Sequence, residues 1–163
     1  MPIQTSPNGT YGTKMPGGKW LQRLIEPLAK RQIDAYRRTG GTNRMSRMMK
    51  FPIVLVTTKG AQSGLERTAA LGGFADGDDA WLVVASNGGS SRHPAWFKNM
   101  VQHPDEIWLE VGSRKMKVRG ESLTSPAREV ALRRITAISA QYGGYPKKTD
   151  REIPIVRLTR ISG

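Results

Sequence analysis

The sequence predicts an antiparallel β-barrel of six strands with α-helices packed outside it, an α+β fold. From residue 51 onward the chain is a series of short β-prone segments separated by turn residues. The turns at residues 60–64, 76–79 and 112–114 are short enough to connect consecutive strands as antiparallel hairpins. A parallel doubly wound sheet is disfavoured, because its strands need long crossover connections. The predicted strands span residues 51–58, 67–74, 80–86, 106–111, 115–122 and 153–159.

The first predicted helix covers residues 19–38. Its apolar residues recur every three or four positions, and basic residues occupy the rest of the helix surface. Pro27 lies inside it, so we expect a kink or two short helices. We expect the apolar side to pack on the barrel. The alternative is a helix that lies at a membrane surface or over a lipophilic substrate.

Two further helices interrupt the series of strands. One is predicted to open at Pro94 and to run to about residue 102. The other is predicted to have Ser125 as its N-cap and Pro126 as its first helical residue, and to run to about residue 140. Four apolar residues of this last helix are expected to face inward: Val130, Leu132, Ile135 and Ile138.

A length of 163 residues predicts one globular domain with a terminal extension. We divide the chain into a flexible arm at 1–18, a basic amphipathic helical segment at 19–50 and a barrel domain at 51–163. There is no cysteine, and the histidines are His93 and His103, so disulfides, thiolate catalysis and a metal site of three imidazoles are excluded. No metal site is predicted.

The apolar runs are strand-sized, and the N-terminus lacks the pattern of a signal peptide. We therefore expect a cytoplasmic protein.

The charge is strongly basic, with 26 Lys and Arg against 13 Asp and Glu, a net charge of +13. Most of the excess lies within residues 1–60, which favours a polyanionic partner such as an anionic membrane surface or a phosphorylated ligand. Few aromatic residues lie near the basic ones, so no nucleic-acid partner is expected.

Small residues fill the segment 85–91, ASNGGSS, between an apolar strand and the helix that opens at Pro94. Glycine allows backbone N–H groups to approach a ligand closely, and a helix start adds partial positive charge. This segment is a candidate site for an anionic or heteroaromatic ligand. A plain glycine-rich turn is the alternative.

A second glycine-bounded loop, residues 60–67, ends in Arg67. The guanidinium offers paired donors for phosphate or carboxylate, and Ser63 and the Gly64 amide would add neutral donors. The alternative is a hairpin turn in which Arg67 pairs with Glu66 or with solvent.

Three aromatic residues are candidates to contact a flat ligand: Trp96, Tyr142 and Tyr145. The two tyrosines follow the last helix on a segment that we expect to be loosened by glycine. His93 is expected to cap a helix or to face solvent. No Ser-His-Asp arrangement stands out, so difficult chemistry would have to come from a bound cofactor.

Four pieces of the chain, in order, resemble the deazaflavin-dependent nitroreductase and quinone reductase family. They are residues 54–71, residues 83–100, the tyrosine pair at 142 and 145, and residues 149–158. The resemblance implies a split β-barrel of the FMN-binding-like type that uses coenzyme F-420. Taken together with the two glycine loops, it gives the predicted cofactor-binding residues Lys59, Ser63, Gly64, Arg67, Ala85, Ser86, Asn87, Gly88, Gly89 and Trp96.

The chain departs from this family at three cationic positions. Members commonly carry Arg-Lys where this chain has Ala61-Gln62, and a lysine where it has Asn87. If the cofactor tail is held, Lys59, Arg92 and the basic N-terminal helix are expected to replace the missing charge.

The resemblance also implies the reaction, a hydride transfer from reduced F-420 to an electron-poor acceptor such as a quinone or nitro compound. Ser86 and Tyr142 would supply a proton or hydrogen bond to the product, and Trp96, Tyr142 and Tyr145 would border the acceptor. The alternatives are an FMN-binding reductase on the same barrel, or a non-enzymatic basic module on a membrane or nucleic acid. A peripheral position at the inner face of the cell membrane would suit the basic helix.

Overall fold

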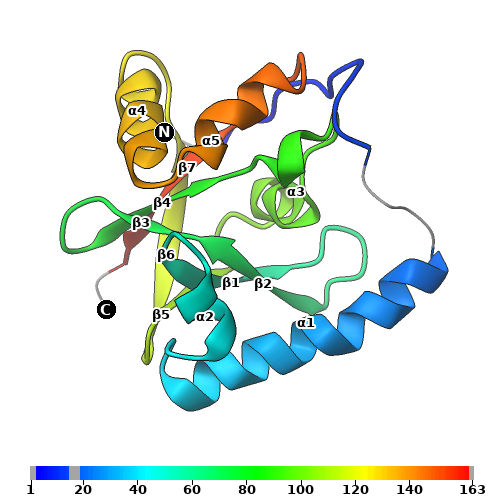
Figure 1. The fold of residues 1–163 in the computed structure, drawn as a ribbon, viewed down its shortest axis with the longest axis vertical. Coiled ribbons are helices and arrows are strands. Elements are labelled where there is room, and N and C mark those ends of the chain that lie inside the picture. Colours follow the sequence, from blue (N-terminus) through cyan, green and yellow to red (C-terminus); the bar gives the residue numbers. More distant parts are fainter. Residues whose placement is uncertain (1–2, 15–18, 162–163) are drawn as a thin grey trace.

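The computed structural model describes residues 3–14 and 19–161. A seven-stranded sheet curls into a half-barrel, and helices flank it (Figure 1). The strand order is β2-β1-β5-β6-β7-β4-β3, and every neighbouring pair is antiparallel. The strands are β1 (Ile53–Lys59), β2 (Glu66–Gly72), β3 (Phe74–Ala75), β4 (Ala80–Val84), β5 (Ile107–Val111), β6 (Arg114–Ser122) and β7 (Ile155–Arg160).

The predicted antiparallel barrel class is confirmed, with seven strands in place of six. The additional strand arises at Gly73, where the predicted segment 67–74 is divided. Phe74 pairs with Leu82 on β4, whereas the residues of β2 pair with β1. A Cβ atom at Gly73 would lie 2.5 Å from the methyl carbons of the buried Val54 side chain, so the close approach at this corner requires glycine.

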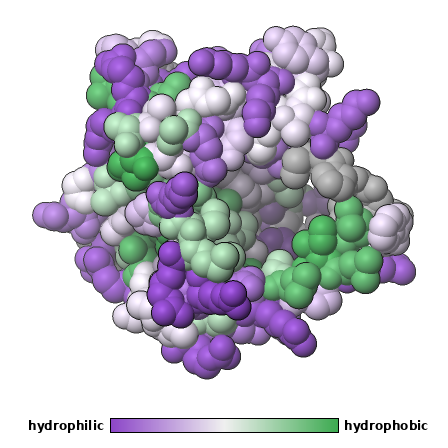
Figure 2. Space-filling view, in the orientation of Figure 1, coloured by the Kyte–Doolittle hydropathy of each residue, from purple (hydrophilic) through white to green (hydrophobic). Residues whose placement is uncertain are grey.

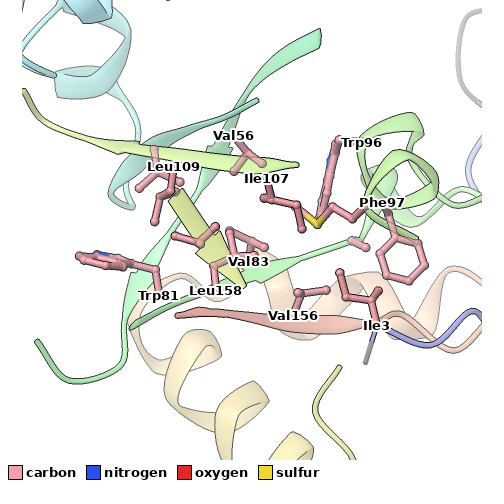
Figure 3. Packing of buried hydrophobic residues seen from close by; sticks show 14 of the residues in the cluster. Ile3, Val56, Trp81, Val83, Trp96, Phe97, Ile107, Leu109, Val156 and Leu158 are labelled. Atoms are coloured by element: carbon pink, nitrogen blue, oxygen red, sulfur yellow. The ribbon is translucent and has the colours of Figure 1, made fainter. Parts of the chain in front are cut away.

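The main core fills the inside of the curled sheet (Figure 3). Alternate residues of β5 and β6 are buried there, as the two-residue period of a strand dictates. Helix α3 (Ala95–Gln102) contributes Phe97 and Met100, which are fully buried. A second cluster lies between the sheet and helix α4 (Ala127–Ile138), and it includes Leu82, Ile135 and Tyr142.

The remaining helical elements connect or cover the strands (Figure 1). Helix α1 crosses one side of the molecule and is followed by the short α2, while the short elements α5 and η2 precede the last strand. Their bounds are α1 (Lys19–Thr39), α2 (Arg44–Met48), η1 (Asn87–Gly89), α5 (Gln141–Gly144) and η2 (Tyr145–Lys147). No helix in the described part of the chain is both long and apolar enough to cross a bilayer.

Hydrogen bonds fix the C-terminal end of α1 to the barrel. The Tyr36 hydroxyl donates to the Ile53 carbonyl at 2.9 Å and accepts from the Gly112 amide at 2.9 Å. Arg37 adds two hydrogen bonds to the Glu110 carboxylate. The helix continues through Pro27 as one element.

The N-terminal half of α1 leaves four of its apolar residues exposed, so the expectation that this side packs on the barrel is wrong for them. Trp20 and Leu24 are 67% and 62% exposed, and Ile25 and Leu28 are 51% and 58% exposed. These residues recur on one side of the helix, but this half extends past the strands. In Figure 2, hydrophobic side chains gather on the surface over this part of α1. We call these four residues, Trp20, Leu24, Ile25 and Leu28, the α1 patch.

Helix α4 buries a narrower side than predicted. Ala131 and Ile135 are buried, whereas Val130 and Ile138 are 46% and 56% exposed, so their predicted inward orientation is wrong. The two buried positions are four residues apart and therefore lie on one line along the helix. The helix begins after Pro126, which is its N-cap, so the prediction of Ser125 as the N-cap is wrong by one residue.

Residues 3–14 are not a flexible arm but lie against the barrel; residues 1–2 and 15–18 fall outside the described part. The Ile3 side chain is buried in the main core beside the sheet (Figure 3). The Gly9 amide donates to the Ser91 carbonyl at 2.8 Å, and the Asp150 carboxylate accepts from Thr10. Composition alone could not show these contacts, because their partners are more than 80 residues away.

We expect Ile3→Ala to destabilise the fold by about 2 kcal/mol, because it leaves a cavity in the core. The matched control is Ile138→Ala, which removes the same atoms from a side chain that is 56% exposed. Urea unfolding followed by far-UV circular dichroism measures both. Equal midpoints for the two variants would show that residue 3 does not belong to the folded core.

Candidate functional site

Two cavities meet at Trp96, on the side of the molecule where β2 and α3 face each other. We call the first, of about 540 Å³, the cation cavity, because Arg67 and Lys98 line it. We call the second, of about 520 Å³, the aromatic cavity. Trp96 is buried in the core and also lines both cavities. The aromatic cavity is lined by Met45, Met49, Phe51, Ile53, Ala70, Leu71, Gly72, Val84, Ser86, Asn87, Gly88, Pro94, Trp96, Gln141, Tyr142 and Tyr145.

Asn99 holds the loop that borders the cation cavity. Its buried side chain accepts from the Ala61 amide at 2.9 Å and donates to the Thr58 hydroxyl at 3.1 Å. The loop is closed by a hydrogen bond from the Gly60 amide to the Leu65 carbonyl at 2.7 Å. Sequence reasoning missed Asn99, because an isolated amide side chain in a helix has no local pattern that marks it.

The cation cavity presents positive charge that no carboxylate of the described residues neutralises. Arg67 lies at the start of β2 and is exposed, and its guanidinium forms no hydrogen bond or ion pair with any described residue. Its predicted alternative partner Glu66 lines a different hollow. Ser63 and Lys98 stand on the same cavity wall, and Lys98 was not predicted. An anionic group can therefore bind here and find two cations available.

Lys59 and Gly64 do not join the other predicted residues. They line a hollow of about 260 Å³ together with Glu66 and Glu106. The Lys59 ammonium lies 3.3 Å from the Glu106 carboxylate. Successive residues of a strand face opposite sides, so Lys59 at the end of β1 points away from the cavity that Arg67 lines.

The loop after β4 turns sharply through left-handed backbone conformations. Ser86 is right-handed helical, and Asn87, Gly88 and Gly89 then have φ of 46°, 63° and 84°. Ser86, Asn87 and Gly88 line the aromatic cavity, which brings three of the predicted cofactor residues together. Ala85 and Gly89 belong to the same loop but are buried, and they are not among the residues that line either cavity.

Tyr142 stands on a helix and not on a loosened loop, because α5 and η2 together order residues 141–147. Its ring packs edge-on against Phe51 and Phe74 at 5.4 Å and against Tyr145 at 5.6 Å. Burial raises the pKa of the Tyr142 hydroxyl to about 12. The hydroxyl therefore remains protonated at neutral pH and can donate a hydrogen bond to a ligand in the aromatic cavity.

His93 is buried, so the prediction of a capping or solvent-facing role is wrong. Its Nε2 lies 2.7 Å from the Ser6 carbonyl, and its Nδ1 lies 2.9 Å from Nη1 of Arg151. Burial is the main cause that lowers the pKa of His93, and the nearby Arg151 and Lys98 charges lower it further. The ring is held neutral beneath the 85–91 loop.

The arrangement of the site agrees with comparisons to known proteins. The family model described as F420H(2)-dependent quinone reductase matches residues 28–160 of this chain. The chain belongs to this family.

Individual relatives and solved structures agree with the family match. An F420H(2)-dependent quinone reductase of Mycobacterium tuberculosis is 34% identical over 148 residues, which are 87% of this chain and 97% of the relative. An F420-H2 dependent reductase structure (FDR-A) has a TM-score of 0.59 and 31% identity, and the match covers 66% of this chain and 93% of that one. A domain-swapped dimer has a TM-score of 0.62 and 28% identity, with coverage of 85% and 96%.

The cavities of this quinone reductase family member suit the chemistry of coenzyme F-420. A deazaflavin ring is flat, and the aromatic cavity is lined by Trp96 together with Ser86, Asn87 and Gly88 of the 85–91 loop. The cofactor tail is acidic, and the adjoining cation cavity offers Arg67, Lys98 and Ser63. Lys98 can supply part of the charge that is missing at Ala61 and Gln62.

We expect Arg67→Ala to weaken the binding of oxidised F-420 at least tenfold, because it removes charge-assisted hydrogen bonds to the acidic tail. A fluorescence titration of the purified protein measures the dissociation constant. The control Arg133→Ala removes the same charge from the exposed side of α4 and should change the constant less than twofold. Equal effects of the two variants would mean that only net charge matters.

Proposed function

We propose that the protein transfers a hydride from reduced F-420 to a quinone bound in the aromatic cavity. The family is one of F420H(2)-dependent quinone reductases, and the protein is accordingly an oxidoreductase that uses F-420. The observation that supports this proposal most directly is the junction at Trp96, where a cavity for an acidic tail adjoins a cavity for a flat ring. FMN, the alternative cofactor, has less support.

The deazaflavin supplies the hydride when it is bound, and the chain positions the acceptor. Trp96 and Tyr145 would wall a planar acceptor in the aromatic cavity. The Tyr142 hydroxyl makes no hydrogen bond with any described residue, so it is available to the acceptor oxygen. A quinone oxygen gains negative charge during reduction, and a donor fixed beside it stabilises that charge. Ser86 would be a second donor at the same cavity.

We expect Tyr142→Phe to slow hydride transfer to a quinone about tenfold or more while F-420 affinity stays nearly constant. The phenylalanine ring retains the packing with Phe51 and Phe74 and removes only the donor. Stopped-flow oxidation of enzyme-bound reduced F-420 at saturating quinone measures the rate. Tyr11→Phe removes a hydroxyl from a side chain that is 60% exposed and serves as the control.

An unchanged rate in Tyr142→Phe would mean that the tyrosine is only a wall of the cavity. Failure of the native protein to oxidise reduced F-420 with any quinone would overturn the proposed function itself. Optical spectra of the bound cofactor separate deazaflavin from FMN in the same experiment.

We further propose that the α1 patch lies on an anionic membrane, where a lipophilic quinone would be available. Its four side chains are exposed along one side of the helix, and Figure 2 shows hydrophobic surface over this part of α1. Exposed arginine and lysine residues flank them, including Arg23, Lys30 and Arg31. Apolar contact with the interface and attraction to anionic headgroups act together in such a helix. The protein would then be peripheral at the inner face of the cell membrane.

We expect the double variant Leu24→Asp, Leu28→Asp to reduce binding to vesicles of phosphatidylglycerol and phosphatidylcholine at least tenfold. Val130→Asp, on the exposed side of α4, is the control and should bind as the native protein does. Vesicle sedimentation measures binding, and light scattering measures the molar mass. Loss of a dimer in the double variant without any vesicle binding by the native protein would assign the α1 patch to a second copy of the chain.

A further inference from the structure

We propose that Arg151 is a positioning residue that fixes the shape of the 85–91 loop, so that two backbone amides of the loop face the aromatic cavity. This inference rests on the proposed function, because the ligand that those amides would meet is the F-420 ring or its acceptor. Arg151 lies shortly before the start of β7 at Ile155, and it lines neither cavity. It would act on a ligand only through the loop.

The buried guanidinium of Arg151 donates to three carbonyl groups of one loop. The carbonyls belong to Ala85 at 3.2 Å, Ser86 at 2.9 Å and Ser90 at 3.1 Å. The side chain is only 4% exposed, and no carboxylate among the described residues pairs with it. A buried charge is costly unless hydrogen bonds satisfy it, so this cation is held in place by the loop carbonyls themselves.

The direction of these carbonyls determines where the neighbouring amides point. In a planar trans peptide, the C=O of one residue and the N–H of the next point in opposite directions. Arg151 draws the Ala85 and Ser86 carbonyls inward, so the Ser86 and Asn87 amides are directed away from it. Neither amide donates to any described residue. Both residues line the aromatic cavity.

The backbone conformation of the loop makes these amides converge. Ser86 is right-handed helical at φ −73° and ψ −33°, and Asn87 follows with φ 46°. A right-handed residue followed by a left-handed one points successive N–H groups into a shared concavity, which attracts negative or partly negative oxygen. The Ser86 carbonyl also accepts from the Gly89 amide at 2.8 Å, which closes the turn.

A second contact braces Arg151 from the opposite side. Arginine can only donate, so Nδ1 of His93 accepts from Nη1 and the ring proton lies on Nε2, which donates to the Ser6 carbonyl. The Thr13 amide donates to the Gly89 carbonyl at 2.9 Å. The N-terminal segment thus holds the outer side of the loop while Arg151 holds the inner side.

The test compares Arg151→Gln with the matched control Arg128→Gln. Arg128 is partly buried and donates to a backbone carbonyl, that of Ile153 at 2.6 Å. It also pairs with Glu152 at 3.7 Å, and it forms no hydrogen bond with the loop. We expect F-420 to bind at least tenfold more weakly to Arg151→Gln and less than twofold more weakly to Arg128→Gln. Urea unfolding of both variants shows whether the affinity change follows stability. Arg151→Lys, which keeps the charge and some donors, should recover part of the affinity.

Amide chemical shifts measured without ligand test the loop directly. We expect ¹H–¹⁵N resonances of residues 86–91 to move in Arg151→Gln and to stay in place in Arg128→Gln. Unmoved resonances, or equal losses of F-420 affinity in the two variants, would overturn the positioning role. If Arg151→Gln does not fold, Arg151→Lys is held to the same criteria. If the native protein binds no F-420, the proposed function fails, and the resonances still decide the role of Arg151.

Discussion

The pairing of β7 with both β4 and β6 is the interaction on which the rest of the molecule depends. It joins the hairpin-built strands β1, β2, β5 and β6 to the separate pair β3 and β4, and so produces one curled sheet. The same pairing carries Arg151 beneath the loop that follows β4. The last strand therefore completes the core and shapes the site at once.

The site combines two chemical environments that a single small cavity could not offer. In one part, Arg67 and Lys98 form no ion pair within residues 3–14 and 19–161, which suits an acidic group. The other part is walled by aromatic rings and holds a neutral tyrosine hydroxyl whose pKa is raised to about 12 by burial. This division matches a cofactor that has an acidic tail and a flat reactive ring. The residues of the exposed α1 patch line neither cavity, and their proposed role is at the membrane surface.

Much of the fold followed from local sequence patterns. The hairpin turns and the alternation of apolar residues predicted the antiparallel barrel, and the helix that begins near Pro94 was also predicted. The division of residues 67–74 at Gly73 was missed, because β2 and β3 follow each other closely in the sequence and look like one strand. They differ only in their partners, which are β1 for β2 and β4 for β3. The burial of Val130 was also predicted wrongly. Helical periodicity shows which residues share a side of α4, but it does not show how much of that side the sheet covers.

The sequence by itself determined the class of the fold, the positions of both glycine loops and, by resemblance, the cofactor and reaction type. The tertiary structure alone decided how those loops are held and which cations reach the site. Asn99 meets Ala61 across 38 residues, and Arg151 meets His93 across 58. Lys59 and Arg67 belong to one hairpin, yet they line different cavities. Local patterns report periodicity and turns, whereas a buried polar group is satisfied by whichever distant residue the folded chain brings to it.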